Sequence, residues 1–246
     1  MRVTGVEATR ARAGGALKLA VPRGALFDGT LDLLDRIGTD TREMRAESRS
    51  LVFSADGLVL VTMRPSDVPT YVEAGAADLG ITGKDVLLEQ RDRAVYELLD
   101  LRYGACRMVL AGRAGDESLG EAERRLGAMR IATKYPRTAA RYFLDTGRQA
   151  EVIEVKGSVE LAPLVGLADG IVDLVNTGTT LAQNQLEVRE EIARCTARLV
   201  ANRVAQSCAR PRWTPWPNGC GRRRRREDRA RGVGRGRSAR VRRAAA

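Results

Sequence analysis

Apolar residues between positions 17 and 205 follow two alternating patterns. Short, mostly apolar runs, which are typical of strands, stand at 17–22, 59–63, 78–82, 107–112, 130–135, 150–155 and 170–175. Between these runs apolar residues recur every three or four positions, as Leu31, Leu34 and Ile37 do, and this spacing predicts helices. Helices are expected over 27–38, from 68 onward, and over 84–90, 119–127, 136–147 and 160–168. Strands that alternate with helices predict βαβ units, parallel sheet and an α/β fold.

This many strands fits two lobes better than one continuous sheet. We expect a first lobe made of residues 17–103 and 182–205, and a second lobe made of residues 104–181. A chain that crosses between lobes twice leaves a cleft, and small ligands bind in such clefts. Residues 1–16 are expected to be a loose N-terminal extension that lacks the apolar region of a secretion signal. No apolar run is long enough to span a membrane, so the expected location is the cytoplasm.

The net charge of +11 comes from one end of the chain. From Arg210 onward there are 14 arginines and two acids, which leaves 28 basic against 29 acidic residues before that point. Residues 206–246 also concentrate glycine, proline and both tryptophans without any periodic pattern, so we expect an Arg/Gly-rich, disordered tail. Such a tail is either a solvated extension without a role or a segment that binds RNA or acidic surfaces.

The residue types present exclude several kinds of chemistry. The chain has no histidine, and its four cysteines (Cys106, Cys195, Cys208 and Cys220) include no C-x-x-C pair. A Ser-His-Asp triad, a Cys-His dyad and a cysteine–histidine zinc site are therefore excluded or nearly so. The thiols are expected to be reduced.

The stretch DGIVDLVNTGTTL, residues 169–181, carries the clearest sign of a ligand. An apolar strand ends there in a Thr-Gly-Thr-Thr turn, whose backbone N–H groups and hydroxyls could cradle a phosphate. Gly178 allows the backbone to approach the ligand closely. Asp173 and Asp169 stand upstream, and a carboxylate there could accept hydrogen bonds from ribose hydroxyls or stabilise positive charge on a sugar ring. A surface turn without a ligand explains T-G-T-T equally well on its own.

Four blocks of sequence together resemble the ATP phosphoribosyltransferase family. They are RPSDVPTYVEAGAADLGITGKDVLLE (64–89), RIATKYP (130–136), GSVELAPLVGLADGIVDLVNTGTTL (157–181) and TARLVANR (196–203). The resemblance implies a two-lobed fold of the periplasmic-binding-protein-like type II, with a cleft between the lobes. It also implies a magnesium-dependent pentosyl transfer, the first step of histidine biosynthesis. N1 of the ATP adenine attacks the anomeric carbon of phosphoribosyl pyrophosphate, and pyrophosphate leaves. Mg²⁺ is expected to be bound mainly through the substrate, without a metal site of the protein's own.

The resemblance assigns roles to residues of the second lobe. Thr177, Gly178, Thr179 and Thr180 would hold the ribose 5′-phosphate. The expected catalytic acids are Asp173, Asp169 and Glu160. The alternative for Glu160 is a plain helix N-terminal charge, which would stabilise the helix by about 0.5 kcal/mol.

The resemblance also implies a set of nucleotide-binding residues. These are Arg23, Gly24, Arg64, Asp67, Gly83, Lys84, Lys134 and Tyr135. For the residues from Arg64 onward, a helix cap or a solvated charge remains the alternative. Many family members carry a second arginine where this chain has Ala25, so one expected cation is missing.

The length of the chain bears on its partners. Long members of the family carry an additional C-terminal domain that binds histidine, and the tail here does not resemble it. The chain is therefore similar to the short form, which works in a hetero-oligomer with a regulatory subunit resembling a histidyl-tRNA synthetase. ATP and phosphoribosyl pyrophosphate are the expected substrates. Two other classes stay open: a solute-binding module of the same two-lobed shape, and a nucleic-acid binder acting only through its tail.

Overall fold

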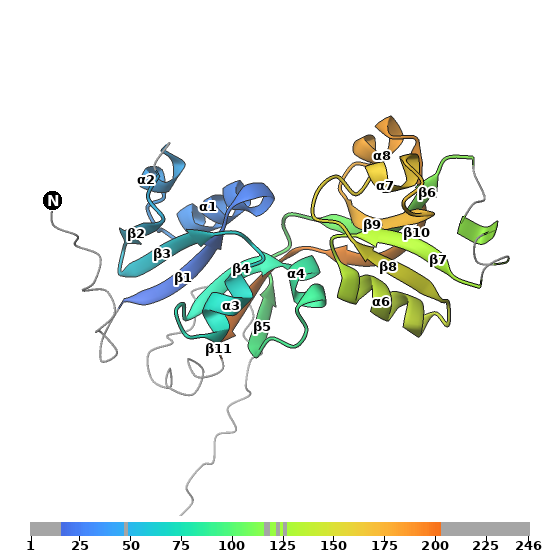
Figure 1. Ribbon diagram of the computed structural model, residues 1–246. Coiled ribbons are helices and arrows are strands. Elements are labelled where there is room, and N and C mark those ends of the chain that lie inside the picture. Colours follow the sequence, from blue (N-terminus) through green and yellow to red (C-terminus); the bar gives the residue numbers. More distant parts are fainter. Residues whose placement is uncertain (1–15, 47–48, 116–118, 122–123, 125–126, 203–246) are drawn as a thin grey trace, which may run out of the picture. The chain divides into compact units, whose positions relative to one another are not determined.

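The computed structural model describes residues 16–46, 49–115, 119–121, 124 and 127–202 (Figure 1). All of them belong to one compact unit, Met1–Arg210. Nearly all of the expected N-terminal extension, the tail 206–246, and residues 122–123 and 125–126 of the helix expected over 119–127 lie outside the described residues. Residues 119–121 and 124 are helical. Within the described part of the chain, no helix is both long enough and apolar enough to cross a membrane.

The strands form two mixed sheets, and helices lie between them along the chain. The strands are β1 (Leu17–Pro22), β2 (Val52–Ala55), β3 (Leu58–Met63), β4 (Leu79–Gly83), β5 (Val95–Asp100), β6 (Cys106–Arg113), β7 (Met129–Thr133), β8 (Ala150–Glu154), β9 (Gly170–Val175), β10 (Leu186–Cys195) and β11 (Ala197–Asn202). The helices are α1 (Phe27–Arg36), α2 (Arg42–Arg45), α3 (Val68–Glu73), α4 (Lys84–Glu89), α6 (Pro136–Asp145), α7 (Leu161–Leu164) and α8 (Thr179–Gln183), with a 3-10 turn η2 (Gly24–Leu26). All seven expected strands are present.

The first sheet has the order β2-β3-β1-β4-β11-β5. Strand β1 pairs in parallel with β3 and β4, whereas β11 is antiparallel to β4 and β5. Successive residues of a strand point to opposite faces. Leu19 and Val21 accordingly share a core with Leu31 of α1, and Ala20 shares one with Val68 of α3. Helices therefore cover both faces of this sheet, as the α/β prediction requires.

The second sheet has the order β10-β6-β9-β7-β8 and is also covered on both faces. Strand β7 is parallel to β8 and β9, and β6 is antiparallel to β9 and β10. Val172 shares a core with Phe143 of α6, whereas Ile171 and Val175 share one with Leu181 of α8. Asp173 lies two residues from both Ile171 and Val175 along β9, so its side chain points to the same face of the sheet as theirs, the face that carries α8.

Two topological expectations need correction. Residues 182–205 do not return to the first lobe as a whole, because β10 pairs with β6 of the second sheet from Leu186↔Arg113 to Cys195↔Cys106. Only β11 rejoins the first sheet. Strand β10 follows α8 after only two residues, so it can pair along the neighbouring edge of the same sheet without a long connection. The sheets are mixed rather than wholly parallel, and strands β2 and β5 were not expected.

The chain passes between the sheets twice, between β5 and β6 and between β10 and β11. Backbone hydrogen bonds join the two passages. The Leu101 N–H donates to the Ala197 carbonyl and the Ala197 N–H donates to the Tyr103 carbonyl, each at 2.9 Å. The two-lobed organisation expected from the sequence therefore depends on a pair of passages that support each other.

Candidate active site

The Thr-Gly-Thr-Thr turn lies between the end of β9 and helix α8. Gly178 adopts φ +84°, and Thr179 begins α8 immediately after it. A left-handed residue followed by a helical one turns successive backbone N–H groups toward a common point, which is the arrangement that binds anions. A Cβ at Gly178 would meet nothing closer than Val175 Cγ1 at 3.9 Å, so the backbone angle rather than space requires glycine here.

The hydroxyls of this turn are available on the surface. Thr177, Thr179 and Thr180 are exposed, and the Oγ1 atoms of Thr177 and Thr179 lie 3.0 Å apart. Backbone amides and hydroxyls at one strand end are chemically suited to a phosphate monoester. The local geometry is therefore that of an anion-binding turn, and phosphate binding by these residues stays a prediction.

Asp173 is a buried carboxylate on the strand that leads into the turn. It is 8% exposed, its Oδ1 accepts a hydrogen bond from the Leu174 N–H at 2.8 Å, and its Oδ2 lies 4.0 Å from Lys134 Nζ. Burial raises the pKa of Asp173, the Leu174 N–H and Lys134 oppose that rise, and the charge of Glu160 adds to it. Asp173, Glu160 and Lys134 therefore form one electrostatic group, and the roles predicted for them stay predictions.

Asp169 stands apart from this group, at the opposite end of β9. Its Oδ1 accepts from Arg130 Nη2 and its Oδ2 from the Arg130 N–H, both at 2.8 Å, and its own N–H donates to the Arg130 carbonyl. Burial acts to raise the pKa of Asp169, but the hydrogen bonds from Arg130 outweigh it and the pKa lies below its usual range. The structure therefore gives Asp169 a partner that ties β9 to β7 and does not bring it to the turn.

A cavity of about 600 Å³ lies next to the turn and takes its walls from elements of both sheets. Leu174 and Asn176 contribute from the end of β9, and Asn176 directly precedes the turn. Gly83 and Asp85 contribute from the β4–α4 junction. The wall is completed by Ala25, Leu26, Pro65, Gly104, Ala105, Cys106, Cys195 and Thr196.

Asp85 is a cavity residue that was not expected from the sequence. Burial raises its pKa, whereas its own N–H, the Val86 N–H and the Tyr135 hydroxyl lower it. The Tyr135 hydroxyl lies 3.4 Å from Asp85 Oδ2, and burial together with the charges of Asp85 and Asp173 raises the pKa of Tyr135. Tyr135 is therefore a neutral hydrogen-bond donor between the two carboxylates. A Cβ at Gly83 would lie 2.0 Å from Asp85 Oδ1, so this carboxylate position depends on glycine.

The remaining predicted nucleotide-binding residues divide into two groups. Two of the cations already have partners in the first lobe. Arg23 donates to Thr62 Oγ1 and to the Ser50 carbonyl, both at 3.1 Å. Lys84 Nζ lies 2.6 Å from Glu97 Oε2. The others are near the rim of the cavity or on the surface. Gly24 (φ +80°) precedes the wall residue Ala25, exposed Arg64 precedes the wall residue Pro65, and exposed Asp67 begins α3 without a side-chain cap.

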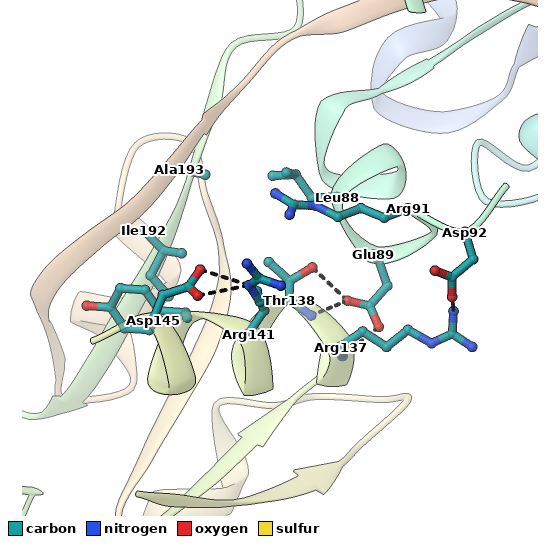
Figure 2. A pocket seen from close by; sticks show the side chains of 11 residues that line it. Leu88, Glu89, Arg91, Asp92, Arg137, Thr138, Arg141, Asp145, Ile192 and Ala193 are labelled. Atoms are coloured by element: carbon teal, nitrogen blue, oxygen red, sulfur yellow. Dashed lines mark hydrogen bonds and ion pairs between the residues drawn. The ribbon is translucent and has the colours of Figure 1, made fainter. Parts of the chain in front are cut away.

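A second cavity, of about 320 Å³, lies beside α6 and is lined mainly by charged side chains (Figure 2). These charges pair with one another. Arg137 Nη1 lies 3.0 Å from Asp92 Oδ2, and Arg141 Nε lies 2.9 Å from Asp145 Oδ1. Because these charged side chains already pair with their neighbours, this cavity is a weaker candidate for a ligand site than the cavity beside the turn.

Comparisons with known proteins find relatives of this chain by sequence and by structure. The family model described as ATP phosphoribosyltransferase (HisG) matches residues 64–214. The ATP phosphoribosyltransferase of Rubrobacter xylanophilus is 56% identical over 190 residues, which cover 76% of this chain and 87% of the relative. That of Carboxydothermus hydrogenoformans is 49% identical over 190 residues, which cover 77% of this chain and 85% of the relative.

Solved structures show the same two-lobed architecture. An ATP phosphoribosyl transferase (HisG:HisZ) complex from Thermotoga maritima superimposes with a TM-score of 0.65 at 38% identity, covering 79% of this chain and 91% of that chain. The periplasmic aliphatic sulphonate binding protein SsuA from Escherichia coli gives a TM-score of 0.51 at 13% identity, covering 79% of this chain and 67% of that chain. The second likeness confirms the periplasmic-binding-protein-like fold and concerns the fold alone.

Proposed function

Because the chain belongs to the ATP phosphoribosyltransferase family, we propose that the turn and the adjacent cavity join ATP to phosphoribosyl pyrophosphate. N1 of adenine forms a bond to the anomeric carbon, and pyrophosphate departs with the bonding electrons. The observation that supports this proposal most is the left-handed turn at Gly178. The turn follows the strand that holds buried Asp173 and comes directly after the cavity residue Asn176.

The phosphoribosyl group would lie along the end of β9. The N–H groups of the turn and the hydroxyls of Thr177 to Thr180 would hold its 5′-phosphate. Asp173, whose buried carboxylate is only partly compensated by Lys134, would accept hydrogen bonds from the ribose hydroxyls and stabilise the positive charge that develops at the anomeric carbon. Glu160 would add a second negative charge to the same region.

The adenine would occupy the cavity. Leu26 and Leu174 supply apolar wall, and Asp85 supplies a hydrogen-bond acceptor for the 6-amino group that adjoins N1. Accepting from that amino group directs N1 and increases its electron density. No covalent nucleophile is needed, so most of the rate acceleration would come from positioning and electrostatic stabilisation.

The side chains around the turn fit a magnesium ion that arrives with the substrate. The described residues hold no cluster of three or more acidic or cysteine side chains able to bind a cation by themselves. Mg²⁺ prefers oxygen ligands and retains several waters, and Asp173 and Glu160 are oxygen donors next to the proposed sugar site. When bound, the ion would neutralise charge on the pyrophosphate.

We also propose a partner and a location. The chain covers 91% of a chain from a HisG:HisZ complex, and like that protein it would work with a regulatory subunit, here one similar to a histidyl-tRNA synthetase. The location would be the cytoplasm, where ATP and phosphoribosyl pyrophosphate are available.

A spectrophotometric assay for phosphoribosyl-ATP, run with and without a candidate regulatory subunit, tests the proposal. We expect turnover that depends on ATP, phosphoribosyl pyrophosphate and Mg²⁺, weak for the chain alone and increased by the partner. Tight binding of either substrate without turnover in both conditions would point instead to a solute-binding module. Full, histidine-inhibited turnover of the isolated chain would contradict the need for a partner.

A further inference from the structure

Cys106 and Cys195 face each other across two strands. Cys106 begins β6, Cys195 ends β10, and the antiparallel register pairs them directly. Both are free thiols, Cys195 is 1% exposed and Cys106 is half-buried. Directly opposed residues of an antiparallel pair have Cα atoms about 4.5–5.5 Å apart, which lies inside the range of about 4.4–6.8 Å that a disulfide requires.

The pair occupies a sensitive place in the fold. Cys106 follows the first passage between the sheets and Cys195 precedes the second, so a bond between them would join the two passages beside their backbone hydrogen bonds. Both cysteines also line the cavity that contains Asp85 and the end of β9. A bond between the two cysteines would therefore alter the wall of the proposed adenine site.

The surroundings favour reaction at Cys106 first. A hydrogen bond with the Cys195 thiol lowers the pKa of Cys106, against the opposing effects of burial and of the Asp85 charge. The same contact is the largest cause of the raised pKa of Cys195, with burial second. Cys106 is also half-buried whereas Cys195 is 1% exposed, so an external disulfide reaches the Cys106 sulfur first.

We propose that Cys106 and Cys195 form a reversible oxidative modification site in the cavity wall. A low-molecular-weight disulfide oxidises the pair, and the resulting Cys106–Cys195 disulfide lowers turnover. The Cys106 thiolate attacks one sulfur of the external disulfide, and one external thiolate leaves. The Cys195 thiolate then attacks Cys106 Sγ in the mixed disulfide and releases the second external thiol. The protein loses two electrons and two protons, and the external disulfide is reduced to two thiols. The effect on turnover rests on the proposed function, whereas formation of the bond does not.

The test uses the full chain with Cys208→Ser and Cys220→Ser, which removes the two cysteines outside the described residues. After incubation with oxidised glutathione, we expect a mass loss of about 2 Da, corresponding to two hydrogens, and a crosslinked peptide pair containing Cys106 and Cys195. Addition of Cys106→Ser or Cys195→Ser should abolish the crosslink. In the presence of the regulatory subunit, oxidation should lower turnover by roughly tenfold or more, and dithiothreitol should restore it.

Two results would overturn the proposal: glutathione adducts without the crosslink, or a crosslinked chain that turns over as fast as the reduced one. The mapping needs no substrate and therefore separates this proposal from the proposed function. A chain that forms the bond but has no turnover in either redox state contradicts the proposed function and supports the modification site.

Discussion

Glu89 at the end of α4 caps the first turn of α6 through Thr138 (Figure 2). Glu89 Oε2 accepts from the Thr138 N–H at 2.9 Å and from Thr138 Oγ1 at 2.8 Å, while its Oε1 accepts from the Arg137 N–H at 2.9 Å. The local N-cap residue of α6, Tyr135, makes no side-chain capping bond. A carboxylate from the first lobe therefore satisfies helix amides of the second, and the lobes are linked by hydrogen bonds as well as by the chain.

Replacement of Glu89 should weaken this link. Loss of an N-terminal cap usually costs about 1 kcal/mol and up to about 2 kcal/mol, so Glu89→Ala should lower the free energy of unfolding by that amount in urea. Asp92→Ala is the matched control, because the Asp92–Arg137 pair is largely exposed and pairs of that kind contribute less than about 1 kcal/mol. Equal losses in the two variants would show that the cap contributes nothing beyond surface charge.

Asp173→Asn tests the role of the buried carboxylate. Removing one preorganised electrostatic group typically costs about 10²-fold in turnover, and we expect at least that loss in the phosphoribosyl-ATP assay. Because the folded pKa of Asp173 is raised, its contribution to stability is fully present below the unfolded pKa and is lost as pH rises through the folded pKa. The free energy of unfolding of the Asn variant should therefore be at least that of the parent at pH 7. The difference between the two should become smaller below about pH 4. Wild-type rates in this variant would refute the assigned role.

Asp169→Asn is the control for the same strand and should show the opposite pattern. The lowered pKa of Asp169 means that its stabilisation is present above the usual carboxyl pKa and is lost as pH falls through the folded value. We expect the free energy of unfolding of the variant to be lower by about 1 kcal/mol or more at pH 7, because hydrogen bonds to a charged group are lost. At about pH 2 we expect little difference in the free energy of unfolding. Its turnover per folded molecule should change little. A loss of turnover matching that of Asp173→Asn would place Asp169 back in the catalytic group.

The contrast between these two aspartates shows what the sequence can predict. The strand 170–175 was predicted with the bounds the structure has, because a short, mostly apolar run is a strong local signal. That Asp169, just before this strand, is held by Arg130 depends on the neighbouring strand β7, and that pairing is not local in the sequence. Strand β5, VYELLD, was missed because Glu97 interrupts its apolar residues, and nearly all of its residues are exposed at a sheet edge, so burial gives them no regular alternation.

The same limit explains why Asp85 was overlooked. A carboxylate in the first turn of a helix is a common response to the helix dipole, so the sequence gives it no special meaning. Its burial beside Tyr135 arises only when the two sheets share a cavity wall. The turn at Thr177 to Thr180, by contrast, is contiguous in sequence, and its predicted form could be recognised without tertiary information.

Gly178→Ala should weaken phosphate binding more than it weakens the fold. An alanine at φ +84° costs about 1–2 kcal/mol, and relaxation toward negative φ would turn the amides away from the phosphate. We expect KM for phosphoribosyl pyrophosphate to rise about tenfold and KM for ATP to change little. Gly147→Ala provides the control, because Gly147 has φ +70°, lies after α6 and has open space around it. If both variants raise KM equally, the effect is backbone strain and the turn does not hold the phosphate.

Asp85→Asn should alter the choice of nucleotide. A carboxylate only accepts hydrogen bonds, so it suits the 6-amino group of adenine and repels the 6-oxo group of hypoxanthine. An amide can both accept and donate, so kcat/KM for ATP should fall by roughly 10–100-fold, while the affinity for ITP as a competing ligand should rise relative to that for ATP. Because Asp85 lies on the first-lobe side of the cavity, KM for phosphoribosyl pyrophosphate should stay near the parent value. Asp85→Ala, which offers neither donor nor acceptor, should weaken binding of both nucleotides without raising the relative affinity for ITP. If Asp85→Asn and Asp85→Ala change both substrates alike, Asp85 supports the fold of the α4 junction and does not recognise the base.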